Sequence, residues 1–170
     1  MLGSQNKIDL EALLTVPLEC LSGIFKCRVS YDHFIHKIEF EKYKIRKTKT
    51  LQLVIADNID YSHKFSDRSL FERLKKSTDA DEILIVKNEK ITDTSFSNIV
   101  FFDEKKWITP DSPLLKGTRR QELLDKGIIH ERKILTIDLR KFKKAKLINA
   151  MLDLEESPEI EMKNILDLTK

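Results

Sequence analysis

The sequence predicts an α/β protein of the α+β kind, in which a small strand-rich part precedes a larger part with alternating strands and helices. Apolar residues alternate with period two between residues 25 and 40, which is typical of strands with one buried face. After Lys64, apolar runs of strand length alternate with apolar residues at helical spacing. We therefore expect two parts, residues 1–56 and residues 57–170.

The composition is that of a soluble globular protein. Of 170 residues, 41% are hydrophobic and 35% charged, enough for one domain with a core and part of a second. The net charge of +3, from 31 Lys and Arg against 28 Asp and Glu, argues against nucleic acid as a partner. No apolar run approaches membrane-spanning length and no signal peptide is recognisable, so we expect a cytoplasmic protein without a membrane partner. The four histidines lack metal-ligand spacing, so we predict no metal site.

The first part of the chain is predicted to hold one short helix and three strands. The helix covers Leu10 to Leu14, and strands follow at residues 25–31 and 34–40. Cys27 falls on the apolar side of the first strand, so we expect it to face inward as a free thiol in a reducing compartment. A third strand from Leu51 to Ala56 is almost entirely apolar, which predicts burial on both faces.

The second part begins with a helix and a pair of hairpins. Asp67 can cap a helix whose apolar residues are Leu70, Phe71 and Leu74. The next predicted strands cover residues 83–86, 91–92, 99–102 and 107–109. Their spacing predicts two antiparallel hairpins, because only a few turn residues separate the strands of each pair.

The end of the chain is predicted to continue this pattern. Thr118 and Gln121 fit a capping box, and Gly127 would end the helix that they begin. Two later strands are expected at residues 134–137 and 147–151, with a short basic helix between them.

Three blocks of the second part offer chemically useful groups. Lys64 supplies an amine before a helix, Asp93 supplies a carboxylate at a strand end, and Gly117 precedes a helix whose first amides could bind an anion. Each also has an ordinary interpretation, namely a surface lysine, a turn aspartate and a loop glycine. No single block identifies a function.

Taken together and in order, the blocks resemble the class IV aminotransferases, the fold-type IV pyridoxal-phosphate enzymes. This family includes branched-chain and D-amino-acid aminotransferases and 4-amino-4-deoxychorismate lyase. The resemblance covers residues 61–156. The chain has K-F-S-D-R beginning at Lys64, T-D-T-S-F-S-N-I-V beginning at Thr92, and L-K-G-T-R-R-Q beginning at Leu115. These match the family's lysine motif and its T-E-x-x-x-x-N-[IL]-[FV] and L-P-G-I-T-R-Q motifs.

The resemblance implies a role for each matched residue. Lys64 would form the Schiff base with pyridoxal 5'-phosphate, and Asp93 would contact the pyridinium nitrogen in place of the family's glutamate, with Asn98 matching the motif's asparagine. The segment L-I-N-A-M (residues 147–151) resembles a strand end that completes the family's phosphate site. The residues implied to bind phosphate are therefore Gly117, Thr118, Arg119, Asn149 and Ala150.

The chain departs from the family at its start. Relatives usually begin with a strand, a turn and an H-x-x-R-like segment that gives an arginine to the phosphate. We expect this segment to precede Met1, so that the small α/β domain is truncated and residues 1–56 are its remnant. Residues 57–170 would then be the large domain that binds the cofactor.

The resemblance implies a homodimeric enzyme that acts on small amino and oxo acids. Its leading function is amino-group transfer between an amino acid and a 2-oxo acid. Two alternatives remain open at this point: 4-amino-4-deoxychorismate lyase activity in the pathway to 4-aminobenzoate and folate, and a non-catalytic truncated homologue. The substrate cannot be read from the sequence, because specificity in this fold depends on loops and on residues of the partner subunit.

Overall fold

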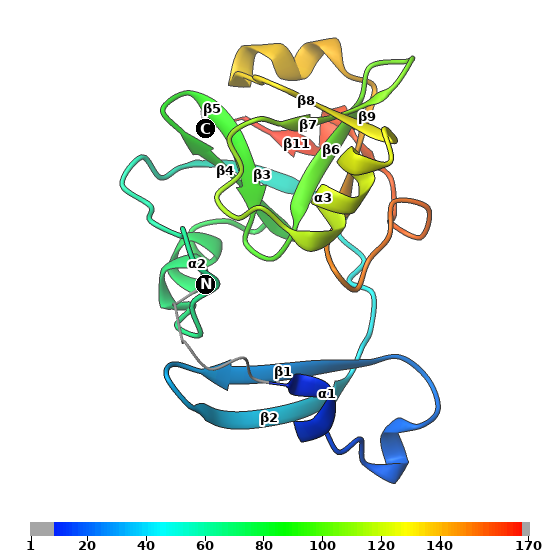
Figure 1. The fold of residues 1–170 in the computed structure, drawn as a ribbon. Helices are drawn as coiled ribbons and strands as arrows, with labels where there is room; N and C mark the ends of the chain where they lie inside the picture. The colour runs from blue at the N-terminus through cyan, green and yellow to red at the C-terminus, as the bar shows by residue number, and fades with distance from the viewer. Residues whose placement is uncertain (1–8, 168–170) are drawn as a thin grey trace. The chain divides into compact units, whose positions relative to one another are not determined.

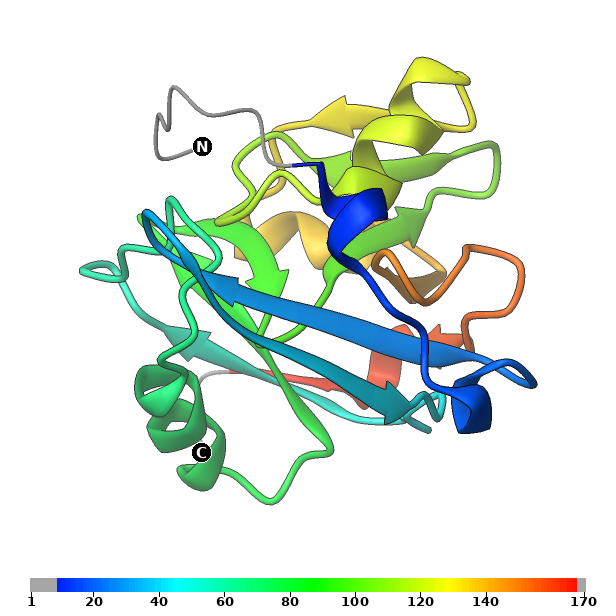
Figure 2. The ribbon, with the colours of Figure 1, turned by 60° about the horizontal axis from the view of Figure 1, so that its bottom comes forward.

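The computed structural model describes residues 9–167, and this part of the chain divides into two compact units between Ile45 and Arg46 (Figure 1). The first unit contains α1 (Leu10–Leu13), the 3-10 helix η1 (Leu18–Cys20), β1 (Phe25–Tyr31) and β2 (Ile35–Lys42). β1 and β2 form an antiparallel hairpin, drawn as a long twisted ribbon in Figure 2. The short helix and the two strands predicted for this unit are confirmed.

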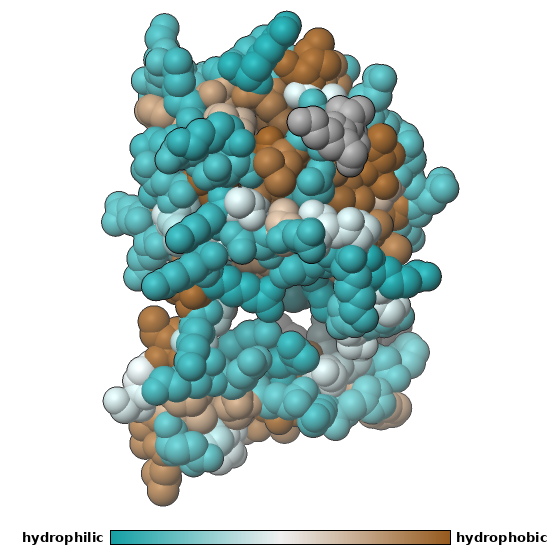
Figure 3. Space-filling view, turned by 180° about the vertical axis from the view of Figure 1, so that it is seen from behind, coloured by the Kyte–Doolittle hydropathy of each residue, from teal (hydrophilic) through white to brown (hydrophobic). Residues whose placement is uncertain are grey.

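The first unit leaves many apolar side chains on its surface, as the brown residues in the lower part of Figure 3 show. A single two-stranded sheet cannot bury both of its faces, and Tyr31 of β1 is 57% exposed. Outside the strands, Leu18 of η1 and Phe34 of the turn are 84% and 75% exposed. Cys27 is a free thiol, as expected, but it is exposed, and the prediction that it faces inward is wrong. The reason is that β1 has no fully buried residue on either face.

The second unit contains two sheets. One has four strands in the order β11-β3-β4-β5, and the other has five in the order β10-β9-β6-β7-β8. The bounds of these strands are β3 (Leu51–Ile55), β4 (Glu82–Lys87), β5 (Lys90–Thr94), β6 (Asn98–Phe102), β7 (Trp107–Pro110), β8 (Ile129–Arg132), β9 (Lys144–Ile148), β10 (Ile160–Glu161) and β11 (Ile165–Leu166). Its helices are α2 (Ser69–Lys76), α3 (Thr118–Asp125), and the 3-10 helices η2 (Thr136–Lys141) and η3 (Met162–Asn164).

The main core lies between the two sheets, because apolar residues with period two point from each sheet toward the other. Leu84 and Val86 of β4 share this core with Ile99 and Phe101 of β6. The opposite face of β4 packs Ile83 and Ile85 against Phe71 of α2, and the opposite face of β6 packs Val100 against Leu123 of α3. The second unit is therefore layered, with a helix on the outer face of each sheet.

The boundary between the units lies before β3, whereas the sequence suggested a boundary after residue 56. β3 pairs in parallel with β4 and with β11, so it is an inner strand of the four-stranded sheet and contributes Leu51 and Leu53 to its core. Long-range parallel pairing with residues 165–166 leaves no local signal in the sequence, which explains the difference.

One predicted strand is wrong. The 3-10 helix η2 begins at Thr136, inside the predicted strand 134–137, and the strand of this region is β8, which pairs in parallel with β7. The Asp138 carboxylate accepts a hydrogen bond from the Leu135 amide at 3.0 Å, which favours the helical turn. Ile134 is fully buried in the main core whereas Ile137 is 62% exposed, so the apolar run does not continue as the buried face of a strand.

No helix among residues 9–167 is long and apolar enough to cross a membrane.

Candidate active site

Asp93 is a buried carboxylate near the end of β5, with 5% of its surface exposed. Its Oδ1 accepts a hydrogen bond from Asn98 Nδ2 at 2.8 Å, and its Oδ2 accepts one from the Leu115 amide at 3.0 Å. Each carboxylate oxygen can accept more than one hydrogen bond, so both retain acceptor capacity. This residue therefore holds a negative charge, or a proton, in the interior of the second unit.

Burial raises the pKa of Asp93 to about 6, because removal from water disfavours the charged form. The backbone amide of Leu115, the side chain of Asn98, the backbone of Leu114 and the charge of Arg120 all lower this pKa and partly offset the effect of burial. The carboxylate is thus ionised at neutral pH but incompletely compensated. A cation or a charged N–H donor brought to it would be bound favourably.

Asn98 connects Asp93 to the segment before α3. It is the first residue of β6, is 6% exposed, and donates a second hydrogen bond from Nδ2 to the Leu115 carbonyl at 2.9 Å. A Cβ atom built on Gly117 would lie only 2.2 Å from Asn98 Oδ1. Glycine is therefore required at residue 117 for α3 to begin this close to Asn98.

The first turn of α3 begins directly after Gly117. Gly117 is the N-cap in an extended conformation (φ −68°, ψ 146°), and no side chain caps the helix. The predicted capping box is wrong, because Thr118 is already the first helical residue and cannot take the N-cap position. The first amides of the helix, including those of Thr118 and Arg119, have no partner within the helix and can donate to an anion. Arg119 pairs through Nη1 with Glu122 at 2.7 Å and with Asp153 at 3.5 Å.

Asn149 and Ala150 lie in the turn that follows β9. The antiparallel register pairs Asn98 of β6 with Ile148 of β9, so this turn begins next to the start of β6. Asn149 closes the turn, because its backbone exchanges hydrogen bonds with Leu152 and its Oδ1 accepts from the Met151 amide at 2.8 Å. Ala150 is exposed at the tip.

Lys64 is exposed and lies on the loop between β3 and α2, a different segment from the one that carries Asp93. In the described part of the chain, no hydrogen bond or ion pair joins Lys64 to Asp93, Asn98 or the start of α3. The sequence thus predicted a group of residues of which Asp93, Asn98 and Gly117 are brought together by contacts. Lys64 remains outside that contact network.

One charged residue close to this network was not predicted from the sequence. Arg120 is 1% exposed, and its Nη2 donates to the Pro110 carbonyl at 2.9 Å and contacts the Glu131 carboxylate. Its Nε is buried without a hydrogen-bond partner. Helical spacing could have revealed it, because Arg120 precedes Leu123 and Leu124 by three and four residues and so lies on the apolar side of α3.

Comparison with known proteins places this arrangement in a family. The sequence profile described as amino-transferase class IV matches residues 17–154. An uncharacterized protein of Haemophilus influenzae is 43% identical over 144 residues, which cover 84% of this chain and 77% of that protein.

Two solved structures have a similar fold. A proposed 4-amino-4-deoxychorismate lyase from Haemophilus somnus is 41% identical and superposes with a TM-score of 0.74, over 78% of this chain and 69% of that one. A proposed amino-acid aminotransferase from Mesorhizobium loti is 22% identical with a TM-score of 0.68, over 81% of this chain and 72% of that one, and shows the fold alone. The chain therefore belongs to the class IV aminotransferases, a family of pyridoxal 5'-phosphate enzymes with the α/β architecture of fold-type IV.

Proposed function

We propose that this chain binds pyridoxal 5'-phosphate and transfers an amino group between an amino acid and a 2-oxo acid. The observation that carries the proposal is the network of Asp93, Asn98 and Gly117, which joins a buried carboxylate to the start of a helix. An aromatic N–H cation and a phosphate on one ligand need these two kinds of group side by side.

The donor set of the second unit fits the cofactor. Asp93 would hold the ring nitrogen in its protonated form, because a buried, incompletely compensated carboxylate favours a charged donor. The free amides of Thr118 and Arg119 would bind the phosphate, with the turn at Asn149 and Ala150 as a second side of that site. The amine of the exposed Lys64 would hold the cofactor's aldehyde carbon.

When bound, pyridoxal 5'-phosphate supplies an electron sink for a bond broken at the substrate's α-carbon. The protein's task is then to bind, orient and move protons. Lys64, once released from the cofactor, is the base that would take the proton from the α-carbon and return it. Asp93 would hold the proton on the ring nitrogen and so keep the ring able to withdraw electrons.

Lyase activity on 4-amino-4-deoxychorismate is the second candidate. It is favoured by the 41% identity to the structure from Haemophilus somnus, whose proposed activity is that reaction. For either reaction we infer a small-molecule substrate, a cytoplasmic location and a homodimer, with the second unit forming the part that binds the cofactor.

A half-reaction separates the two candidates. We would load the protein with cofactor, add an amino acid without any 2-oxo acid, and follow the visible absorption and the 2-oxo acid released. An aminotransferase converts one equivalent of cofactor to its aminated form and releases one equivalent of 2-oxo acid. In a parallel sample that receives 4-amino-4-deoxychorismate in place of the amino acid, a lyase turns over while its cofactor returns unchanged. A non-catalytic homologue shows neither reaction.

A further inference from the structure

Arg68 makes contacts on both sides of the loop that carries Lys64. Its Nη1 donates to the hydroxyl of Tyr61 at 2.8 Å, and its guanidinium carbon lies 4.7 Å from the centre of the Phe71 ring. Tyr61 and Arg68 lie on either side of Lys64 in the loop between β3 and α2, so their hydrogen bond closes residues 61–68 with Lys64 near the middle. Residues 62–67 are exposed, so this closure limits how far Lys64 can move.

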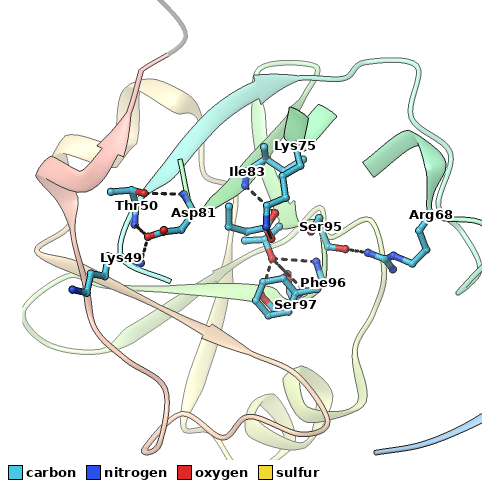
Figure 4. Close-up of polar contacts among 11 residues, drawn as sticks. Lys49, Thr50, Arg68, Lys75, Asp81, Ile83, Ser95, Phe96 and Ser97 are labelled. Atoms are coloured by element: carbon cyan, nitrogen blue, oxygen red, sulfur yellow. Dashed lines mark hydrogen bonds and ion pairs between the residues drawn. The ribbon is translucent and has the colours of Figure 1, made fainter. Parts of the chain in front are cut away.

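The same guanidinium reaches a second element. Its Nη2 donates to the main-chain oxygen of Ser95, and Figure 4 shows the Arg68 side chain directed at that oxygen. Ser95 lies in the tight turn between β5 and β6, which Thr94 and Ser97 hold with a side-chain hydrogen bond at 2.7 Å. Asp93 immediately precedes this turn.

A planar guanidinium is suited to such a bridge, because its donors point in fixed directions and can reach two acceptors at once. Tyr61 is 8% exposed and stacks edge-on with Phe71 at 4.7 Å between ring centres, so the acceptor on the loop side is itself fixed. On the other side, Ser95 is 9% exposed. The bridge thus joins two buried anchors and leaves Lys64 exposed between Tyr61 and Arg68.

We propose that Arg68 is a positioning residue that holds the Lys64 loop against the β5–β6 turn. The amine of Lys64 and the carboxylate of Asp93 can then reach the same bound cofactor. This inference rests on the proposed cofactor role of Lys64. It predicts a selective effect, because Arg68 would affect the bond to Lys64 and not the binding of the ring or phosphate.

Two forms of the cofactor test this predicted selectivity. Pyridoxal 5'-phosphate has the aldehyde that reacts with a lysine, whereas pyridoxamine 5'-phosphate has an amine there and binds without Lys64. We would measure the dissociation constants of both for wild type, Arg68→Met, Arg68→Lys, Tyr61→Phe and Lys64→Ala. Arg73→Met is the matched control, since Arg73 is an exposed arginine on α2.

We expect Arg68→Met to weaken pyridoxal 5'-phosphate about tenfold, the size of effect that follows from losing a hydrogen bond to a charged group. Binding of pyridoxamine 5'-phosphate should change less than about twofold. Lys64→Ala should show the same selective loss, and Arg73→Met none. Arg68→Lys, which keeps the charge but has its donors on a single nitrogen, should recover part of the loss. Tyr61→Phe should show a weaker form of the loss.

An equal loss of both ligands in the Arg68 variants, or no loss of either, would overturn the proposal. If Arg68→Met does not fold, Arg68→Lys and Tyr61→Phe decide the question by the same ratio. Failure of the underlying function has a different signature: Lys64→Ala would then bind both ligands as wild type does, and borohydride would trap no cofactor on the wild-type protein. That result would remove the role of Arg68 as well.

Discussion

Asn98 Nδ2 lies 2.8 Å from Asp93 Oδ1 and 2.9 Å from the Leu115 carbonyl, so one side-chain amide joins the end of β5 to the segment that leads into α3. Through this contact the buried carboxylate and the first turn of α3 are held in a fixed relationship.

Asp93→Asn should reduce turnover about a hundredfold or more while cofactor still binds. The neutral amide keeps the size of the side chain but cannot hold a proton on a bound ring nitrogen by its charge. The measurement is kcat for the amino-transfer or lyase reaction, with cofactor content determined on the same samples. Asp79→Asn, at an exposed aspartate, is the control and should leave kcat unchanged. Wild-type kcat in Asp93→Asn would show that Asp93 is only a structural residue.

The stability of the cofactor-free protein should depend on pH through Asp93. Its pKa is about 6 when folded, against 3.8 as the reference value, so between these values the folded state holds a proton that the unfolded state has lost. The free energy of unfolding therefore falls as pH rises through this window, by up to about 3 kcal/mol from this residue.

Asp93→Asn removes this titrating group, so its free energy of unfolding should fall less over the same pH range. Urea denaturation of both proteins at several pH values between about 4 and about 7 measures the difference in slope. Absolute stability is not the readout, because the new amide also alters the hydrogen bonds to Asn98 and Leu115. Parallel pH profiles for the two proteins would contradict a raised pKa at Asp93.

Gly117→Ala should both destabilise the fold and weaken cofactor binding. The added Cβ would lie 2.2 Å from Asn98 Oδ1, so Asn98 must move and release Asp93 and Leu115. We expect a loss of about 1–3 kcal/mol in the free energy of unfolding. Relative to wild type, the affinity for pyridoxal 5'-phosphate should fall more than the affinity for pyridoxal.

Gly127→Ala is the matched control for that substitution. Gly127 has φ +66° with no atom within 4 Å of an added Cβ, so alanine there is strained without crowding any neighbour. It should cost about 1 kcal/mol and leave cofactor affinity unchanged. If the two variants lose cofactor affinity equally, the close contact of Gly117 with Asn98 has no role in binding.

Arg120→Met should lower the free energy of unfolding by about 2–4 kcal/mol. The buried guanidinium is the donor to the Pro110 carbonyl and the partner of Glu131, and methionine replaces neither contact. Loss of its charge should also raise the pKa of Asp93 further. Arg140→Met, at an exposed arginine, should cost less than about 0.5 kcal/mol; comparable losses in chemical denaturation would mean that Arg120 contributes no more than a surface residue.

Local patterns in the sequence were sufficient to predict most of the helices and strands. Period-two alternation predicted β1 and β2, and the turn residues Asn88 and Glu89, both at positive φ, predicted the β4–β5 hairpin. The parallel pairings of β3 with β11 and of β7 with β8 were not predictable, because their partners lie far apart in the sequence and no turn records them.

In the candidate site, too, local motifs were predictable and long-range contacts were not. Asp93, Asn98 and Gly117 were predicted from short motifs, and their contacts join them in the structure. Arg68 is part of the K-F-S-D-R motif, but nothing in the sequence assigned it a role. Its contact with Ser95 joins two segments that lie far apart in the sequence. Arg120 was hidden for a related reason: a charged residue is expected at the surface unless its helical spacing is examined.

The cofactor role of Lys64 is tested most directly by chemical trapping. The protein is incubated with pyridoxal 5'-phosphate, reduced with borohydride, digested and mapped by mass spectrometry, with Lys64→Ala and the exposed-lysine variant Lys76→Ala treated in parallel. We expect one modified peptide, carrying the cofactor on Lys64, in the wild type and in Lys76→Ala, and none in Lys64→Ala. A modification on another lysine, or none in the wild type, would contradict it.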